Sequence, residues 1–527
     1  MMKAKRSLGK IKRATDWSNL KVIYKVSMAR LYGVSLDKYL KNKAYMLDNK
    51  ALKKLGMIIN NNRKIIANIE KETGWSKKKI NAEVKEAKER GISLYRYNFY
   101  RCFELNEKEQ KDLVETLEKR DIKREKHKLW YANAIKEKTG VTKEEALEKL
   151  DIAKEKGYNY YQFIVSGKYG LSVNELKRLP RRKSVKIIST DTDRKIKEQV
   201  RLDEERVKRE MNWNEGEIKL DILKAQVNSG CNVHEYYIYN FYKMPFDEQK
   251  KYITSEIWRK LYIRYCDYAD TWKYFKQKPL FNEKFKKYVK RDWLSVGDMN
   301  FNDFSKFIKN KNMLIYKPLD TACGIGIKKY NITKNKLQNR SLYFKLKHYK
   351  DGVIEEIIKQ HKDMAKLNPS TINTVRVQTI VTNNKVNFLN ATVRMGASSK
   401  STTDNFSSGG IMANVDLKTG KIMGNASSKF GGIIKEHPES HVKFNGFQIP
   451  CWDKILKTVE EAAQVVKTMP YIGWDVVINE DSSIQLIEGN HDADATFHQY
   501  CPAVTEGKGI RDTIDKYIWF DDESKTV

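Results

Sequence analysis

The sequence contains few of the features that mark secreted or membrane-spanning proteins. It has six cysteines in 527 residues, and none of them forms a CxxC pair. This scarcity excludes a disulfide framework and argues against a cysteine-based zinc site. No stretch reaches the roughly 18 uncharged apolar residues that a membrane-spanning helix needs. The basic N-terminal stretch has no apolar segment of the kind found in signal peptides. We therefore expect a cytoplasmic protein, or one peripheral to the inner face of the membrane.

Acidic residues are scarce in the first part of the chain. The whole sequence carries 101 lysines and arginines against 67 aspartates and glutamates, a formal charge of +34. Residues 1–350 hold 82 basic and 44 acidic side chains, whereas residues 351–527 hold 19 and 23. This asymmetry predicts two regions with different electrostatic roles. A hydrophobic content of 40% and an aromatic content of 11% exclude wholesale disorder.

The N-terminal half contains a degenerate helical repeat, with copies near residues 16, 74, 140 and 212. The copies near 74 and 140 align without gaps as a glycine, a polar helix, a second glycine, an aromatic run and a second helix. Ser76 and Thr142 are placed to cap their helices, and Gly91 and Gly157 to end them with positive φ. We expect the aromatic runs to pack in small cores rather than to stack on sugars or bases.

From Met313 onwards the sequence changes to short β-type runs separated by Gly, Asn and Asp. Two amphipathic helices, at 352–366 and 453–469, lie between these runs. The predicted fold class is α+β, with an all-α region of degenerate repeats in front of it. We place basic helical repeats at 1–250, a helical lead-in at 251–315, the α+β domain at 316–515 and a tail at 516–527.

The segment YIGWDVVINEDSSIQLIEGN, 471–490, has the pattern of a β-hairpin. A four-residue loop at 480–483 would pair Asn479 with Ile484 and place Asp475 directly opposite Glu488. Strand alternation brings Asn490 to the same face. Two carboxylates that face each other need a cation between them or a shared proton. These two side chains and one amide oxygen form a hard-oxygen site that suits Mg²⁺.

Two further segments carry basic residues near β-type runs. In MLIYKPLDTACGIGIKKY, 313–330, a strand leads to Lys317 and then to a loop with Gly324 and Gly326. Such a loop can bring backbone N–H groups to a phosphate beside the lysine ammonium, and an ordinary hairpin turn is the alternative. Arg376 and Arg394 each interrupt an apolar strand. The planar guanidinium group of arginine suits phosphate or carboxylate, although outward-facing strand arginines are also common.

Taken in order, these segments resemble the ATP-grasp superfamily. The pieces that carry the closer resemblance are RDWL (291–294), NTVRVQT, TVRMG, NFSSGG (405–410), VDLKTG, YIGWDVVI and IEGNHD. They are similar to the sugar-transfer-associated branch, which is glutamate-ligase-like and is associated with bacterial polysaccharide loci. The resemblance covers roughly 260–515, about half of the chain, and leaves the helical repeats outside it.

The resemblance implies ATP and Mg²⁺ as cofactors, with the nucleotide between two α+β layers. Asp475, Glu488 and Asn490 match the magnesium signature of the superfamily in residue type and spacing. The expected roles of the other residues also follow from the resemblance: Lys317 with Gly324 and Gly326 for the α- and β-phosphates, Arg376 and Arg394 for the γ-phosphate, acyl phosphate or substrate, and the backbone of Glu356, Ile357 and Ile358 for adenine.

The activity that the resemblance implies is that of an ATP-dependent carboxylate–amine ligase. An acyl phosphate would form first and an amine would displace its phosphate, on a bacterial surface polysaccharide or its precursor. A kinase for a sugar or polyol hydroxyl is the alternative, since phosphoryl transfer is common to both. Nucleic-acid binding through the basic half is the third and least favoured reading. An anionic polymer or a protein is the partner expected for the repeats.

Overall fold

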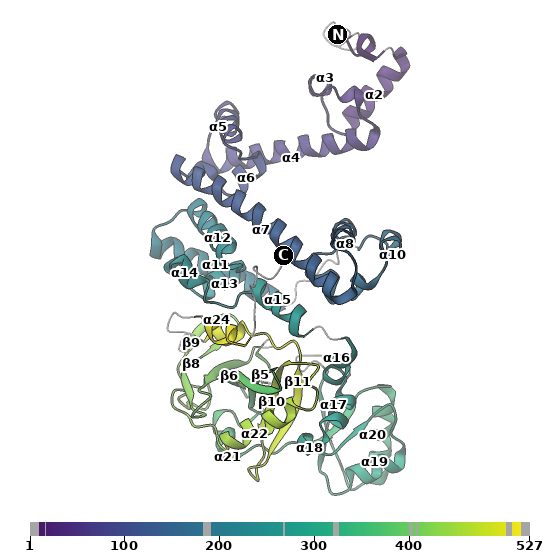
Figure 1. Ribbon diagram of the computed structural model, residues 1–527, viewed down its shortest axis with the longest axis vertical. Helices are drawn as coiled ribbons and strands as arrows, with labels where there is room; N and C mark the ends of the chain where they lie inside the picture. The colour runs from purple at the N-terminus through teal and green to yellow at the C-terminus, as the bar shows by residue number, and fades with distance from the viewer. Residues whose placement is uncertain are drawn as a thin grey trace. The chain divides into compact units, whose positions relative to one another are not determined.

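The structure is a computed structural model that describes residues 10–15, 17–182, 191–266, 269–319, 326–399, 404–406, 409–501 and 509–517. The chain forms two compact units (Figure 1). One contains the chain up to Arg120 together with Val207–Leu223, and the other contains Asp121–Arg206 and the chain from Lys224 onwards. The domain boundaries expected from the sequence stay predictions. In the described residues, no helix is both long and apolar enough to cross a membrane.

Each repeat copy folds as a helix, a six-residue helix and a 3₁₀ turn. The four sets are α2 (Asn19–Leu31), α3 (Leu36–Lys41) and η1 (Ala44–Met46); α5 (Lys77–Glu89), α6 (Leu94–Phe99) and η2 (Cys102–Glu104); α8 (Lys143–Glu155), α9 (Tyr160–Val165) and η3 (Lys168–Gly170); and α12 (Glu215–Ser229), α13 (Val233–Ile238) and η4 (Phe241–Lys243). Other helices join or follow them: α4 (Asn49–Thr73), α7 (Glu107–Thr139), α10 (Val173–Arg178), α11 (Asp191–Met211) and α14 (Phe246–Gln249).

The predicted helix ends are confirmed. The side chains of Ser76 and Thr142 each accept a hydrogen bond from the backbone N–H three residues further on, at 3.3 and 3.2 Å. Gly91 and Gly157 follow the helices with φ of +87° and +86°. In this left-handed region a side chain would be strained, which explains why both copies carry glycine there.

The expectation that the aromatic runs pack in cores is correct for some of their members and wrong for others. Tyr97, Tyr100 and Phe163 are buried. Tyr95 and Phe99 are instead 64% and 48% exposed, and their rings stack on each other with centroids 5.9 Å apart. A six-residue helix has one buried face only, so aromatic residues on its other face remain at the surface.

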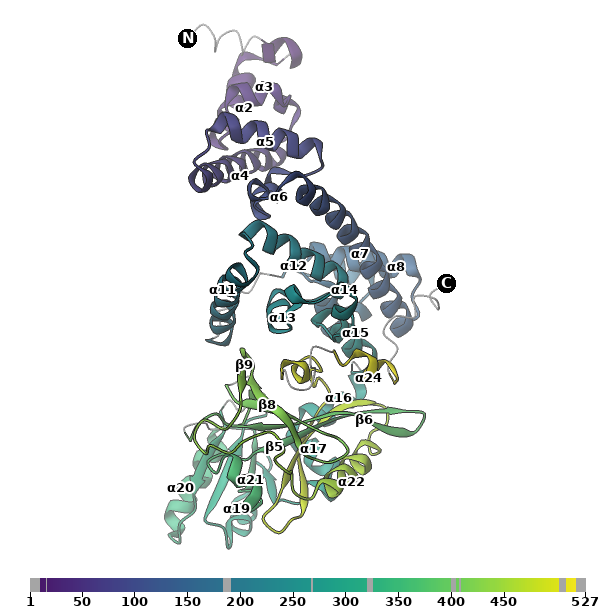
Figure 2. The ribbon, with the colours of Figure 1, turned by 90° about the vertical axis from the view of Figure 1, so that its left-hand side faces the viewer.

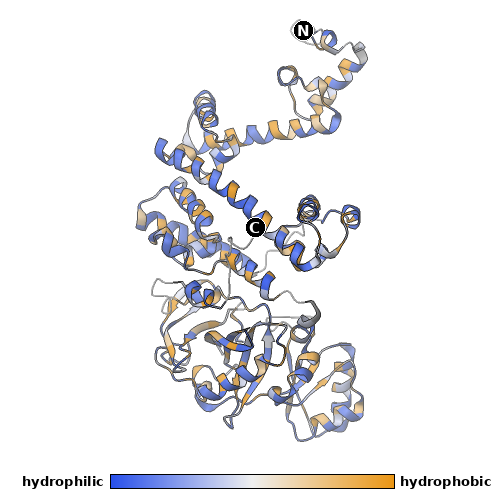
Figure 3. Ribbon diagram, viewed as in Figure 1, coloured by the Kyte–Doolittle hydropathy of each residue, from blue (hydrophilic) through white to orange (hydrophobic). Residues whose placement is uncertain are grey.

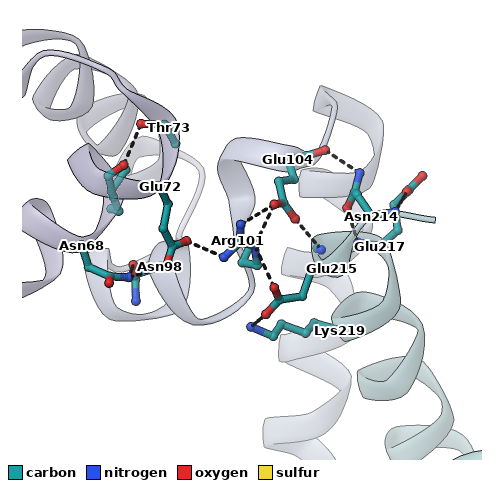
Figure 4. A network of polar contacts seen from close by, with 12 residues as sticks. Asn68, Glu72, Thr73, Asn98, Arg101, Glu104, Asn214, Glu215, Glu217 and Lys219 are labelled. Carbon is teal, nitrogen blue, oxygen red and sulfur yellow. Dashed lines mark hydrogen bonds and ion pairs between the residues drawn. The ribbon is translucent and has the colours of Figure 1, made fainter. Parts of the chain in front are cut away.

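Within the first unit, Arg101 links the second repeat to the fourth (Figure 4). Its guanidinium group forms an ion pair with Glu72, another with Glu104 at 2.5 Å and a third with Glu215 at 3.4 Å. Glu104 also accepts a hydrogen bond from the backbone N–H of Gly216, at 2.8 Å. This network lies between segments more than 100 residues apart and fixes how they stack.

Figure 3 shows hydrophobic and hydrophilic stretches alternating along α4, as expected for a helix with one buried face.

The second unit contains two antiparallel sheets, which confirms the predicted α+β fold class. The small sheet has the strand order β1-β4-β2-β3 and the large sheet β11-β10-β5-β6-β7-β8-β9. The strands are β1 (Trp293–Ser295), β2 (Met313–Lys317), β3 (Lys328–Asn331), β4 (Val353–Glu356), β5 (Thr374–Thr382), β6 (Lys385–Met395), β7 (Ile411–Val415), β8 (Ile422–Ser428), β9 (Gly431–Ile434), β10 (Tyr471–Ile478) and β11 (Ile484–Asn490).

Helices cover the sheets and leave one face of the large sheet partly polar. The helices of this part are α15 (Ser255–Tyr265), α16 (Ala269–Lys276), α17 (Lys278–Lys284), α18 (Lys286–Val289), α19 (Phe301–Ile308), α20 (Lys336–His348), α21 (Lys362–Leu367), α22 (Trp452–Ala463) and α24 (Arg511–Asp515), with the turn η6 (Phe497–Tyr500). Figures 1 and 2 show α22 and α24 on opposite sides of β5 and β6. Residues of α22, such as Ile455 and Val459, share a core with Val375 and Val377 of β5. The alternate residues of β5 therefore face the other way.

Candidate active site

A cavity of about 1020 Å³ lies between the two sheets. The small sheet contributes Ile315, Lys317, Lys329 and Glu355 to its lining, and the large sheet contributes Thr374, Arg376, Gln378, Asn390, Thr392, Arg394, Asp475, Glu488 and Asn490. The other lining residues are Lys278 of α17, Glu356–Ile358 at the end of β4 and beyond it, His498 of η6, and Asp404, Phe406 and Asp494 outside the strands and helices named above. The expected placement of a nucleotide between two layers is therefore compatible with the space that the fold provides.

Charged side chains form a continuous row across the floor of this cavity. Strand pairing places Glu488 opposite Asp475, Asp475 opposite Arg376 and Arg376 opposite Thr392. Cross-strand neighbours have Cβ atoms about 4.5–5.5 Å apart, so these side chains are in direct contact range. Four strands thus deliver one polar row, and two residues further along, Gln378 of β5, Asn390 of β6 and Asn490 of β11 add polar side chains.

Asp475 is the centre of this row and is only 2% exposed. It pairs with Arg376, whose Nη2 lies 2.8 Å from Oδ2, and with Arg394, whose Nη2 lies 2.7 Å from the same oxygen. Burial by itself would raise the pKa of Asp475, but the two guanidinium groups hold this pKa well below its usual range. Asp475 is therefore a permanent anion that orients both arginines toward the cavity.

Glu488 and Asn490 complete the oxygen cluster expected from the sequence. The Nδ2 atom of Asn490 lies 3.2 Å from Glu488 Oε1 and 3.4 Å from Asp475 Oδ2. Burial raises the pKa of Glu488, and the negative charge of Asp475 raises it further. Two carboxylates that destabilise each other are the arrangement that a divalent cation would stabilise. The donor set therefore fits Mg²⁺, although the role of these three residues stays a prediction.

The cluster consists of two carboxylates and one amide, and it contains no third carboxylate. In the part of the chain that the structure describes, no group of three or more His, Cys, Asp or Glu side chains could hold a metal ion. A site with few protein ligands is typical of Mg²⁺, which keeps water and phosphate oxygens in its coordination sphere. The composition of the cluster thus matches a metal that binds together with a nucleotide.

The turn of the hairpin differs from the sequence-based expectation. Ile484 pairs with Ile478 rather than with Asn479, so the turn is one residue longer than predicted. A register shift between Asp475 and Val476 then adds one residue on β11 and restores the pairing of Asp475 with Glu488. The predicted carboxylate pair is confirmed, and its predicted turn register is wrong.

The opposite wall of the cavity is organised by a buried glutamate. Glu355 is 2% exposed and forms ion pairs with Arg291 at 2.8 Å and with Lys317 at 2.6 Å. Arg291 also donates to the backbone oxygens of Leu486 and Ile487 on β11, at 2.6 and 3.1 Å. Burial of Glu355 opposes its ionisation, but the two cations hold its pKa far below the usual range. This network ties the small sheet to the edge of the large one.

The remaining residues expected to contact the nucleotide lie around this network. Glu356, Ile357 and Ile358 line the cavity, as a hinge for adenine requires, and Lys317 ends β2 beside them. Gly326 has φ of +78°, and a Cβ there would come within 2.9 Å of the Pro318 ring. Gly324 lies outside the described residues. Their contacts with ATP stay predictions.

Sequence reasoning missed much of the polar surface of the cavity. Gln378 and Asn390 are hydrogen-bonded to each other at 2.6 Å, and Thr374 donates to Asp404 through its backbone N–H at 3.1 Å. A usable signal was present, because polar residues occupy every second position of β5 and β6. Such alternation usually indicates a solvated sheet face, and here it indicates a ligand cavity instead. Asp494 and His498 belong to an irregular loop and gave no comparable signal.

Residues 295–516 match the model described as sugar-transfer associated ATP-grasp. The match covers less than half of the chain, and it shows which family this stretch is similar to. The suspected resemblance is therefore confirmed for the part of the chain that contains the cavity. ATP and Mg²⁺, the cofactors expected from the sequence, are those that ATP-grasp enzymes use. A search of the curated proteins found no match.

Several solved structures are similar to the chain at low identity. The ATP-grasp ligase PsnB in complex with a minimal precursor is 13% identical, with 49% of this chain and 64% of PsnB covered and a TM-score of 0.29. The D-alanine–D-alanine ligase from Coxiella burnetii is 8% identical, with 46% and 56% covered and a TM-score of 0.28. The L-amino acid ligase from Bacillus licheniformis is 10% identical, with 43% of each chain covered and a TM-score of 0.26. The chain thus spans less than two thirds of the length of each of these proteins.

Proposed function

We propose that this protein is an ATP-dependent carboxylate–amine ligase that forms an amide through an acyl phosphate. The observation that carries the proposal is the row of Glu488, Asp475 and Arg376 on the floor of a cavity between two sheets. Anionic oxygens for a metal and guanidinium groups for a transferring phosphoryl group lie side by side there. The match to the family model supports the use of ATP, and the name of the family supports a role near sugar transfer.

We propose a role for each of the residues that line the cavity. Asp475, Glu488 and Asn490 would hold Mg²⁺, which neutralises charge on the phosphates when it is bound. Glu356, Ile357 and Ile358 would meet adenine through the backbone, and Lys317 would neutralise the α- and β-phosphates together with the loop that contains Gly324 and Gly326. Since Glu355 fixes Lys317 at 2.6 Å, this ammonium group is held at the cavity wall before the nucleotide arrives.

The chemical step requires stabilisation of charge at the γ-phosphate. A carboxylate oxygen of the substrate attacks the γ-phosphorus, and ADP leaves with the electrons of the broken bond. An amine nitrogen then attacks the acyl carbon, phosphate leaves and one proton is released. Arg376 and Arg394 would stabilise the developing charge, because Asp475 holds both guanidinium groups in fixed positions. The acceptor is proposed to be a bacterial surface polysaccharide or its precursor.

Trapping of the acyl phosphate tests this proposal. The full chain is incubated with ATP, Mg²⁺, hydroxylamine and a panel of carboxylic acids that includes uronic acids and amino acids. Formation of a hydroxamate together with ADP supports a ligase, because hydroxylamine captures only an activated acyl group. ADP release with sugars or polyols and without any hydroxamate would favour the kinase alternative and overturn the proposal.

The helical repeats are proposed to recruit an anionic polymer that carries the acceptor. The support is the excess of 82 basic over 44 acidic side chains in residues 1–350. Binding of this kind weakens steeply as salt rises, because counterions are released from the polymer. If the affinity for an anionic glycan is the same at low and high salt, this role is contradicted. If a protein binds with salt-sensitive affinity instead, the partner of the repeats is a protein.

A further inference from the structure

One end of the cavity is closed by the loop Ala493–Cys501. Gln378 Nε2 lies 3.4 Å from the backbone oxygens of Ala493 and of Asp494, which places the start of the loop over β5. Asn414 of β7 donates to the backbone oxygen of His498 at 2.9 Å. The loop therefore crosses the polar face of the large sheet from β5 to β7. Arg291, which pairs with Glu355 of the small sheet, instead donates to Leu486 O of β11, so the nucleotide side and this end lie over different strands.

Tyr239 of the fourth repeat and Ile253 beyond it hold this loop in place. Gln499 is 3% exposed, and its side-chain amide accepts from Ile253 N at 2.9 Å and donates to Ile253 O at 2.7 Å. It also donates to the hydroxyl of Tyr239 at 3.2 Å, and that hydroxyl donates to the backbone oxygen of Thr496 at 3.3 Å. A loop fixed by buried hydrogen bonds presents its side chains in defined positions, so the wall of this end is a built feature of the fold.

Two acidic side chains, Asp404 and Asp494, line this part of the cavity. Asp494 accepts a hydrogen bond from Thr496 N at 2.8 Å, and Asp404 accepts one from Thr374 N at 3.1 Å. Burial raises the pKa of both carboxyl groups. Arg394 compensates part of the charge on Asp404, whereas the cation that acts on Asp494 is Lys429. A carboxylate that lines a cavity and is partly removed from water favours a cationic ligand.

A histidine and two aromatic rings line the same end. His498 lines the cavity and is only 7% exposed, and its Nδ1 has no hydrogen-bond partner among the residues that the structure describes. Burial lowers the pKa of His498 to about 3, so its ring is neutral and offers a hydrogen bond without positive charge. Phe406 and Phe497 pack against each other with centroids 5.3 Å apart. Apolar surface beside a carboxylate and a neutral imidazole suits an organic ammonium compound.

We propose that this end of the cavity binds the primary ammonium group of the amine substrate, with the carboxylate of Asp494 as its main partner. The inference rests on the proposed function, because the amine is the second substrate of that reaction. The ammonium group gives one proton to the carboxylate of Asp494, and the nitrogen lone pair then attacks the acyl carbon. Phosphate leaves with the electrons of the broken C–O bond and takes up the second proton that the nitrogen loses, while the proton on Asp494 passes to solvent. Asp404 adds negative charge, and Phe406 with Phe497 contacts the carbon skeleton.

The test uses amines paired with uncharged analogues of the same skeleton. The full chain is saturated with Mg²⁺ and the ATP analogue AMPPNP, and the affinity of each probe is measured by calorimetry. The pairs are glucosamine with N-acetylglucosamine, ethanolamine with ethylene glycol, and 1,4-diaminobutane with 1,4-butanediol. We expect at least one amine to bind more tightly than its analogue. The variant Asp494→Asn should weaken that amine about tenfold or more, as loss of a charged hydrogen bond does.

Two controls make the outcome decisive. Asp481→Asn, in the exposed turn between β10 and β11, should leave amine binding unchanged. Asp494→Asn should leave the affinity for ADP with Mg²⁺ within about twofold, which shows an intact nucleotide side. The inference is overturned if no amine binds better than its analogue, or if Asp494→Asn binds it as tightly as the natural protein does. Failure of ADP binding would instead count against the proposed function.

Discussion

Glu488 lies directly opposite Asp475 on the neighbouring strand, and the two carboxylates belong to one polar row. The arginines pair with Asp475, whose pKa is low, while burial and the charge of Asp475 raise the pKa of Glu488. The two carboxyl groups therefore differ in pKa before any ligand binds. A metal ion would remove this repulsion, and the apo protein carries its cost in stability.

The change Glu488→Gln should have opposite effects in the presence and absence of nucleotide. Without ligand we expect the melting temperature to rise slightly, because a repulsive negative charge is removed. With ADP and Mg²⁺ we expect most of the ligand-induced stabilisation to disappear, whereas in the natural protein it reaches about 2.7 kcal/mol at a hundredfold excess over Kd. Differential scanning fluorimetry measures both effects.

Glu480→Gln is the matched control, because Glu480 lies exposed in the adjacent turn. Its stabilisation by ADP and Mg²⁺ should equal that of the natural protein. Full stabilisation of Glu488→Gln by the nucleotide, with the same dependence on Mg²⁺, would show that this carboxylate is not a metal ligand.

The sequence was sufficient to predict the carboxylate pair, because a hairpin brings residues 13 positions apart together through local pairing alone. Helix caps such as Ser76 were predictable for the same reason. The pairing of Asp475 with Arg376 joins residues 99 positions apart through the β5–β10 contact, and no local pattern specifies it. The ion pair of Glu355 could not be predicted from the sequence either, because its partner Arg291 lies 64 positions away.

Glu355→Gln should destabilise the protein strongly. The change removes the charge that compensates Arg291, which is 3% exposed, and Lys317. Breaking a buried ion pair by removing one partner typically costs about 3–5 kcal/mol, because the other charge stays buried. Urea unfolding measures the loss. Glu356→Gln, at the next position on the same strand, should cost less than about 1 kcal/mol, since Glu356 has no buried ion pair to lose. Equal losses for the two variants would contradict the assignment.

Gln499→Leu should loosen the contact between the fourth repeat and the loop at the cavity end. Leucine has a similar size but leaves the buried backbone groups of Ile253 without their partners. An unsatisfied buried polar group costs about 1–3 kcal/mol, so we expect a fall in unfolding free energy of at least about 2 kcal/mol. The amide protons of residues near Ile253 should also exchange faster by hydrogen-exchange mass spectrometry.

Gln338→Leu, on the exposed surface of α20, should change neither measurement. Unchanged exchange in Gln499→Leu would rule out the proposed support of the loop.

The buried imidazole of His498 should make the protein less stable as the pH falls. Burial lowers its pKa from 6.5 to about 3, so the unfolded chain binds a proton between these values and the folded protein does not. Stability from this group is complete above pH 6.5 and is lost progressively toward about pH 3. Between about pH 7.5 and 5.5 the loss should be about 1.4 kcal/mol, and His498→Gln should remove that part of the slope. His441→Gln, at a side chain that is 72% exposed, should retain the full slope. Urea unfolding measures this pH dependence. If it is equal in His498→Gln and the natural protein, the imidazole of His498 takes up a proton in the folded state as readily as in the unfolded chain.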